Sequence, residues 1–113
     1  MPRFAILYHE TPPNSNRPPH FDLLLESETA LRTWALAGQP AAGQVIEAQA
    51  LPDHRLHYLD YEGPVSDNRG TVTRWDSGRF AWLDDTPQEI RVRLAGDRLA
   101  GIAVLGRSTE TSE

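Results

Sequence analysis

The sequence predicts a mainly β protein: a small closed or partly closed β-barrel of about six to eight short strands with little helix. Apolar and polar residues alternate with a period of two over much of the chain, as they do on strands with one buried face. Turn-forming groups of Asp, Gly, Ser and Pro recur roughly every 8 to 12 residues. A length of 113 residues fits one domain, which we expect to span residues 1–107.

The N-terminal third predicts two strands joined by a long loop. Residues 3–8 (RFAILY) and 20–26 (HFDLLLE) alternate in the manner of strands. The ten residues between 9 and 20 include four prolines, which a helix or a central strand does not accommodate. We therefore expect these two segments to form a hairpin closed by an irregular loop.

The rest of the chain is less uniform. Residues 30–37 (ALRTWALA) and 44–51 (QVIEAQAL) fit a strand or a helix equally well. Asp-Ser-Gly, Asp-Asp-Thr-Pro and Ala-Gly-Asp turns separate the segments that follow them, and the polar residues 108–113 are expected to form a disordered tail. The strands expected between these turns are residues 70–75, 78–83, 89–94 and 98–106.

Composition excludes several classes of function. The chain has no cysteine and no lysine, which excludes disulfides, thiolate chemistry, Schiff bases and a P-loop. No apolar run approaches the roughly 20 residues of a membrane span, and the N-terminus does not have the pattern of a signal peptide. We therefore expect a cytoplasmic protein without a membrane partner. A net charge of −5 argues against non-specific DNA binding through bulk electrostatics.

The first hairpin predicts a candidate metal site. The simplest register sets His9 opposite His20 and Leu7 opposite Asp22, so one face is apolar while both histidines and the aspartate share the other. Two imidazoles and one carboxylate with open positions form a set that holds a divalent metal. The alternative interpretation is that His9 and His20 are ordinary polar residues at strand ends.

A second polar cluster lies in residues 51–64. It contains His54, His57, Tyr58 and Tyr61, and a histidine that titrates near neutrality can act as a general acid or bind phosphate. The alternative is a surface turn with tyrosines packed beneath it.

Five segments occur in one order along the chain: 20–26 (HFDLLLE), 31–36 (LRTWAL), 53–58 (DHRLHY), 61–63 (YEG) and 70–78 (GTVTRWDSG). Together they resemble the 3′-phosphoesterase domain of bacterial DNA ligase D. That family shows H-Y-D-x-R-L-E, L-K-S-W-A-V, E-D-H-P-L-D-Y, F-E-G and G-x-V-x-V-W-D-x-G. No single motif is specific, and the ordered set carries the resemblance.

The resemblance implies a compact β-barrel that removes a ribonucleoside or phosphate from DNA 3′ ends with Mn²⁺. It places His20 and Asp22 at two metal ligands and His9 at the third, although the loop between the histidines is about five residues longer here. His54 and Tyr58 match the residues that contact the scissile phosphate. Zn²⁺ or another divalent metal, and a phosphoester other than a DNA end, remain alternatives.

The departures from the family pattern concern phosphate binding. The family's arginine after the H-x-D motif is Leu24 here, so a cation is missing where an ionised phosphate needs charged donors. Arg55, Arg69 and Arg74 are candidates to replace it, and Arg17 in the proline-rich loop is another. The alternative function is therefore a non-catalytic metal-binding or accessory module that acts with a DNA-repair protein.

Overall fold

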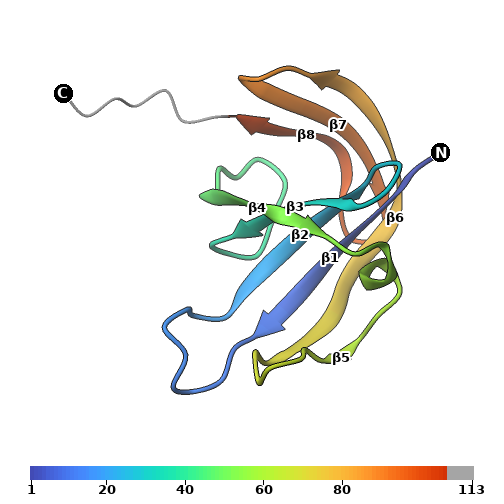
Figure 1. Ribbon diagram of the computed structural model, residues 1–113. Coiled ribbons are helices and arrows are strands. Elements are labelled where there is room, and N and C mark those ends of the chain that lie inside the picture. Colours follow the sequence, from blue (N-terminus) through green and yellow to red (C-terminus); the bar gives the residue numbers. More distant parts are fainter. Residues whose placement is uncertain (107–113) are drawn as a thin grey trace.

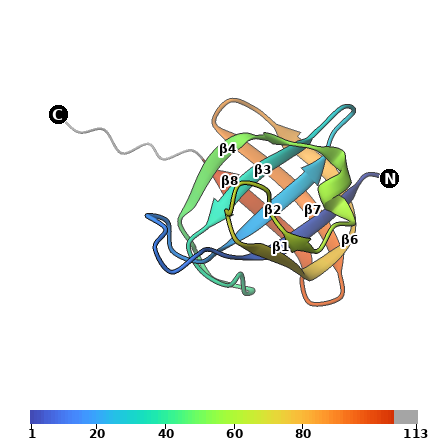
Figure 2. The same cartoon turned by 60° about the horizontal axis from the view of Figure 1, so that its bottom comes forward.

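The computed structural model describes residues 1–106, which form one antiparallel sheet of eight strands in the order β4-β3-β2-β1-β6-β7-β8, with β5 paired to β6. The sheet curls into a partly closed barrel (Figures 1 and 2). This confirms the predicted fold class. The elements are β1 (Arg3–Glu10), β2 (His20–Glu26), β3 (Leu31–Leu36), β4 (Ala48–His54), η1 (Leu56–Leu59), β5 (Gly63–Pro64), β6 (Thr71–Asp85), β7 (Glu89–Gly96) and β8 (Ala100–Gly106).

The predicted first hairpin is confirmed in its register. Cα partners on β1 and β2 include Ala5 with Leu24, Leu7 with Asp22 and His9 with His20. The backbone N–H of Arg3 also donates to the Glu26 carboxylate at 2.8 Å. Because the side-chain period of a strand is two, this register decides which residues share a face.

Both faces of this hairpin carry buried apolar residues. The predicted apolar face contributes Phe4, Ile6, Leu23 and Leu25 to a core cluster on the concave side of the sheet. The polar face also supports a second cluster under η1, which the sequence analysis did not predict. Its buried members are Ala5, Leu7, Leu24, Leu31, Leu59 and Val72.

The two ambiguous segments resolve as strands, with different boundaries. Residues 31–36 form β3, as one of the two interpretations has it. The second segment begins only at Ala48 and continues to His54, because β4 pairs with β3 from Leu36 to Leu31. Residues 44–47 therefore lie in neither a strand nor a helix, and the strand extends beyond 51 into the second polar cluster.

The prediction of two strands over 70–75 and 78–83 was wrong. They form one strand, β6, of 15 residues that pairs with β1 along its first half and continues along β7. The Asp-Ser-Gly triplet forms no turn, because its three residues pair with β1 and Asp76 is buried. The strand accommodates this pairing through a register irregularity opposite Ile6 and Leu7. Gly78 serves a close approach, since an added Cβ would lie 2.1 Å from the Ala95 carbonyl oxygen.

A large hollow lies on the concave side, away from the candidate metal ligands. It has a volume of about 1100 Å³ and lies between the edge strands β4 and β8. The hollow's apolar lining includes Ile6, Leu23, Trp34, Leu36, Ile90 and Leu94.

No helix within residues 1–106 is long and apolar enough to cross a bilayer. The disordered tail predicted for 108–113 lies outside the described residues.

Candidate metal centre

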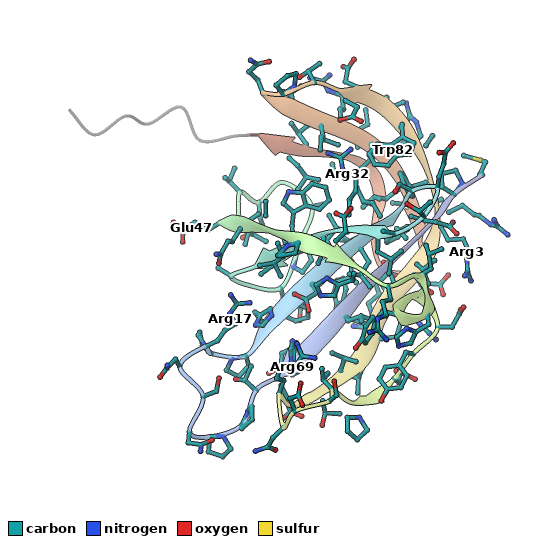
Figure 3. All side chains as sticks on the ribbon, in the orientation of Figure 1. Arg3, Arg17, Arg32, Glu47, Arg69 and Trp82 are labelled. Atoms are coloured by element: carbon teal, nitrogen blue, oxygen red, sulfur yellow. The ribbon has the colours of Figure 1, made fainter. Side chains whose placement is uncertain are left out.

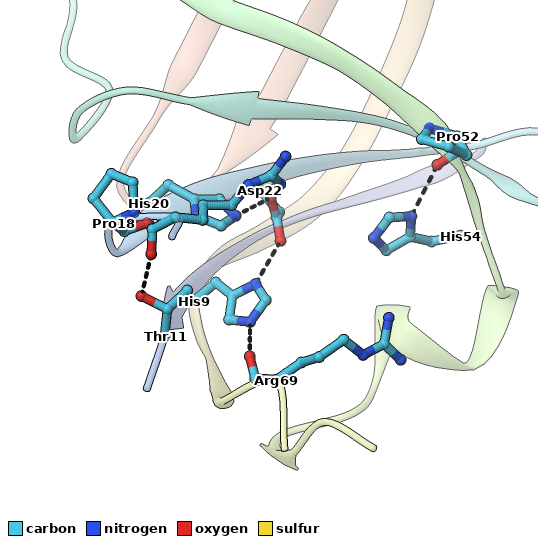
Figure 4. A network of polar contacts seen from close by, with 9 residues as sticks. His9, Thr11, Pro18, His20, Asp22, Pro52, His54 and Arg69 are labelled. Carbon is cyan, nitrogen blue, oxygen red and sulfur yellow. Dashed lines mark hydrogen bonds and ion pairs between the residues drawn. The ribbon is translucent and has the colours of Figure 1, made fainter. Parts of the chain in front are cut away.

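The pairing of β1 with β2 brings together the three side chains predicted to bind metal. One ligand atom from each of His9, His20 and Asp22 lies within 4.8 Å of the other two. Nε2 of His20 is 3.1 Å from Oδ1 of Asp22, and Nδ1 of His9 is 3.5 Å from Oδ2 (Figure 4). Directly opposed positions supply the two histidines and the i+2 position supplies the carboxylate, as strand geometry predicts.

The remaining nitrogen of each histidine is bound to a backbone carbonyl. Nε2 of His9 lies 2.8 Å from the Arg69 oxygen, and Nδ1 of His20 lies 3.1 Å from the Pro18 oxygen. A carbonyl only accepts, so these two nitrogens carry the hydrogen. In the neutral imidazoles, the lone pairs of His9 Nδ1 and His20 Nε2 therefore face Asp22. This is the arrangement by which carbonyls orient metal-binding histidines.

Charge and burial at Asp22 also call for a cation. Burial disfavours its charge, yet the contacts with His20 and His9 outweigh burial and hold the pKa of Asp22 below its ordinary value. The same contact with the Asp22 carboxylate raises the pKa of His20, against its burial. A positive charge beside this buried carboxylate is therefore favourable.

The donor set fits a divalent metal. Oδ1 of Asp22 is buried and has no hydrogen-bond partner among the described residues. Donor atoms that share one ion at about 2.1 Å lie about 3 to 3.5 Å apart, which matches the 3.1 and 3.5 Å contacts to Asp22. Two imidazoles and a carboxylate suit Mn, Fe or Zn.

His54 lies on the same face of the sheet as this cluster. It is the last residue of β4 and pairs with Leu31, which pairs in turn with Glu26, and opposed residues share a face. Figure 4 shows His54 on the same side of the hairpin as His9 and Asp22, with its ring directed towards them. Its Nδ1 lies 3.0 Å from the Pro52 oxygen and carries the hydrogen, so Nε2 holds the lone pair of the neutral ring.

Tyr58 is placed by η1 beside His54. The two rings meet edge-to-face with centroids 5.9 Å apart. Tyr58 also packs on the apolar cluster beneath η1, and its ring lies 5.6 Å from that of Tyr61. The structure therefore brings both residues of the predicted phosphate-binding pair together, and it gives Tyr58 a packing role as well.

Of the three predicted phosphate-binding arginines, the structure brings one into direct contact with the cluster. Arg69 does so through its backbone oxygen on His9. Arg55 is exposed before η1, and Arg74 lines a small hollow with Tyr8 and Trp75. Neither contacts the three predicted ligands through a hydrogen bond or ion pair in the described part of the chain.

Leu24 is unsuited to phosphate binding for a structural reason. Its side chain is 0% exposed and packs in the apolar cluster capped by Leu59 of η1. The position is on the same face as His20 and Asp22, as the register predicts. The structure thus fills with hydrocarbon the place where the family motif has a cation.

Two features of the centre escaped the sequence analysis. The carbonyls of Pro18 and Arg69 orient the histidines, and a backbone oxygen carries no residue-type signal. The apolar cluster beneath the site had a visible signal, because Ala5, Leu7 and Leu24 alternate with the first core residues. Both sets of alternating positions are apolar, which is typical of strands buried on two faces.

Comparison with known proteins identifies the family. The model of the DNA Ligase D 3′-phosphoesterase domain matches residues 13–107, a stretch that includes His20, Asp22, His54 and Tyr58 but not His9. The multifunctional non-homologous end joining protein LigD of Pseudomonas aeruginosa is 32% identical over 93 residues, which are 73% of this chain and 11% of the relative.

A second relative gives the same result. The multifunctional non-homologous end joining DNA repair protein LigD of Mycobacterium tuberculosis is 32% identical over 101 residues, which are 81% of this chain and 13% of the relative. The chain thus spans a small part of each of these relatives. Because the family model covers most of the chain and agrees with the ordered motifs, the chain belongs to the DNA ligase D 3′-phosphoesterase domain family.

Proposed function

We propose that the chain is a metal-dependent phosphoesterase that processes DNA 3′ ends, with His9, His20 and Asp22 as the metal ligands. The observation that carries the proposal is the approach of three acceptor atoms to within 4.8 Å of one another, with each histidine oriented by a carbonyl. The resemblance favours Mn²⁺, and the donor set also accommodates Zn²⁺. The family's association with DNA repair supports a cytoplasmic location.

The roles of the chain's own residues follow from their placement. A bound divalent ion supplies a Lewis acid that polarises a phosphoryl oxygen. His54 directs its ring towards the ligands and binds the phosphate or protonates the leaving group. Tyr58 holds the His54 ring in place through the edge-to-face contact and steadies the phosphate with its hydroxyl.

The metal-binding part is tested by thermal denaturation with and without Mn²⁺. Ligand at a hundredfold excess over Kd stabilises the native state by about 2.7 kcal/mol, so the melting temperature of the wild type rises. Asp22→Asn should lose this shift. Asp53→Asn is the matched control and should keep it, because Asp53 is an exposed aspartate on β4, which β3 separates from β2. An equal shift in both variants would contradict the assignment.

The catalytic part is tested with oligonucleotides that end in a 3′-phosphate or in a single 3′-ribonucleotide. We expect Mn²⁺-dependent release of the terminal group, reduced at least tenfold in His54→Ala. His57→Ala is the control, because His57 is exposed in η1 and stacks on Tyr58 without a hydrogen bond to the cluster. Equal rates in both variants would remove His54 from the mechanism.

One observation favours a second function. The buried, apolar Leu24 leaves the metal site without the family's cation, which fits a non-catalytic module that binds metal and a DNA-repair protein. Such a module would bind Mn²⁺ and a 3′-phosphorylated oligonucleotide without turnover, and it would co-purify with a repair protein. Turnover of either oligonucleotide would exclude this alternative.

A further inference from the structure

The turn of residues 65–70, between β5 and β6, is held rigidly against β1. The Val65 N–H donates to the Gly70 oxygen at 2.8 Å, and Asp67 and Asn68 adopt left-handed φ values of 62° and 54°. Gly70 has a φ of 103°, and an added Cβ would lie 1.9 Å from the Glu10 oxygen. These conformations and the close approach at Gly70 restrict the backbone path beside residue 69.

Arg69 makes two separate kinds of contact from this turn. Its carbonyl accepts from Nε2 of His9 at 2.8 Å. Its guanidinium donates from Nε to the Ser66 oxygen at 2.9 Å and from Nη2 to the Ser66 hydroxyl at 3.1 Å. In the described part of the chain the guanidinium forms no ion pair with a carboxylate, so its charge and its remaining N–H groups are available to an anion.

The Arg69 side chain leaves the backbone beside the metal ligand His9. In Figure 4 it runs from the carbonyl beside His9 to the side of the cluster on which His54 lies. Figure 3 shows Arg69 and Arg17 at the end of the sheet where β1 ends and β2 begins. The electrostatic effect of Arg17 on His20 places a second positive charge close to the ligands.

We propose that Arg69 replaces the cation missing at Leu24: its guanidinium binds the phosphate, while its carbonyl orients the metal ligand His9. The inference rests on the proposed function, and it names a phosphate-binding residue that comes from a loop and not from β2. A charge-assisted donor held by Ser66 is pre-organised for a phosphate oxygen. One residue thus joins the metal-binding and phosphate-binding halves of the site.

The two roles are separable because one belongs to the side chain and the other to the backbone. Arg69→Gln removes the charge and keeps the carbonyl. Arg93→Gln is the matched control, since Arg93 is an exposed arginine on β7 and the charge change is the same. The readouts are the Mn²⁺-induced shift in melting temperature and the anisotropy of a labelled oligonucleotide with a 3′-phosphate at two salt concentrations.

Arg69→Gln should weaken oligonucleotide binding by about tenfold or more and reduce the salt slope by about one phosphate contact, with an unchanged Mn²⁺ shift. Arg93→Gln should remain within about twofold of the wild type. Equal binding by the two variants overturns the guanidinium role. A wild type that binds neither Mn²⁺ nor the oligonucleotide overturns the proposed function itself, and the inference with it.

The carbonyl role has its own measurement. Nitrogen chemical shifts of the His9 ring report which nitrogen carries the hydrogen, and we expect Nε2–H in the metal-free wild type and in Arg69→Gln alike. A ring protonated at Nδ1 alone in the wild type would overturn this part, because the carbonyl would then hold no N–H. This readout is independent of activity and of metal loading.

Discussion

Restoring the family's arginine at position 24 should unfold the protein and not improve it. The register places residue 24 on the same face as His20 and Asp22, so Leu24→Arg looks like a simple repair of the phosphate-binding site. In this chain, however, the side chain is fully buried among Ala5, Leu7 and other apolar residues. A guanidinium there has no room to reach solvent without displacing η1.

The size of the effect follows from that burial. Losing a fully buried leucine costs about 1.5 to 3 kcal/mol, and an uncompensated buried charge costs about 3 to 5 kcal/mol more. Asp22 is about 7 Å away along the strand face and is already engaged by both histidines, so it compensates little. The total is comparable to the whole stability of a small domain, about 5 to 15 kcal/mol.

Urea denaturation monitored by the fluorescence of the three tryptophans measures this directly. With a slope of about 1 to 3 kcal/mol per molar urea, Leu24→Arg should lower the midpoint by more than about 1.5 M or abolish the cooperative transition. Leu24→Met, which conserves volume, should change the stability by less than about 1.5 kcal/mol. An arginine variant with the wild-type midpoint and faster phosphoester hydrolysis would refute the reasoning.

Three further predictions concern stability. Asp76→Asn should lower the free energy of unfolding, measured by urea denaturation, by about 2 to 4 kcal/mol. Oδ2 of Asp76 accepts the Leu99 N–H at 2.8 Å, whereas the NH₂ group of an asparagine in that place would donate. An unchanged midpoint would contradict this prediction. Gly96→Ala should destabilise by about 1 to 3 kcal/mol, since the new Cβ would lie 2.5 Å from Asp76; equal stability would show that the neighbours yield. In EDTA, the free energy of unfolding should be greatest between about pH 4 and 6.5. Above this range it should fall as His20, whose pKa is raised in the folded state, loses its proton. Below this range it should fall as Asp22, whose pKa is lowered in the folded state, gains a proton. A higher melting temperature at pH 8.5 than at pH 5.5 would contradict this.

The first hairpin shows why part of the site was predictable. Alternation over residues 3–8 and 20–26 defined two faces, and setting His9 opposite His20 placed Asp22 beside them. Local periodicity suffices here because the same register satisfies the buried face and brings the polar groups together. The ordered motifs then added His54, which lies two strands away and which no local pattern connects to β2.

Other features depend on contacts between distant segments. Asp76 resembles a turn residue by type, but it is buried and accepts the N–H groups of residues 97–99, which only the folded sheet brings within reach. The carbonyl of Arg69 acts on His9 from 60 positions away. Residue type in a sequence reports side-chain chemistry, whereas these interactions depend on where the backbone passes.

The irregularity in β6 opposite Ile6 and Leu7 bears on how the length of this chain can vary among its relatives. Val72 packs in the cluster beneath η1 and Phe80 in the concave core, although residues eight apart share a face on a regular strand. The extra residue at this irregularity reverses the alternation, so one strand contributes side chains to both apolar clusters. Inserting or deleting another residue there would turn the side chains of half the strand to the opposite face. Residues 11–19, in contrast, lie outside the ladder, and we expect homologues to differ in length in that loop while β6 keeps its residue count.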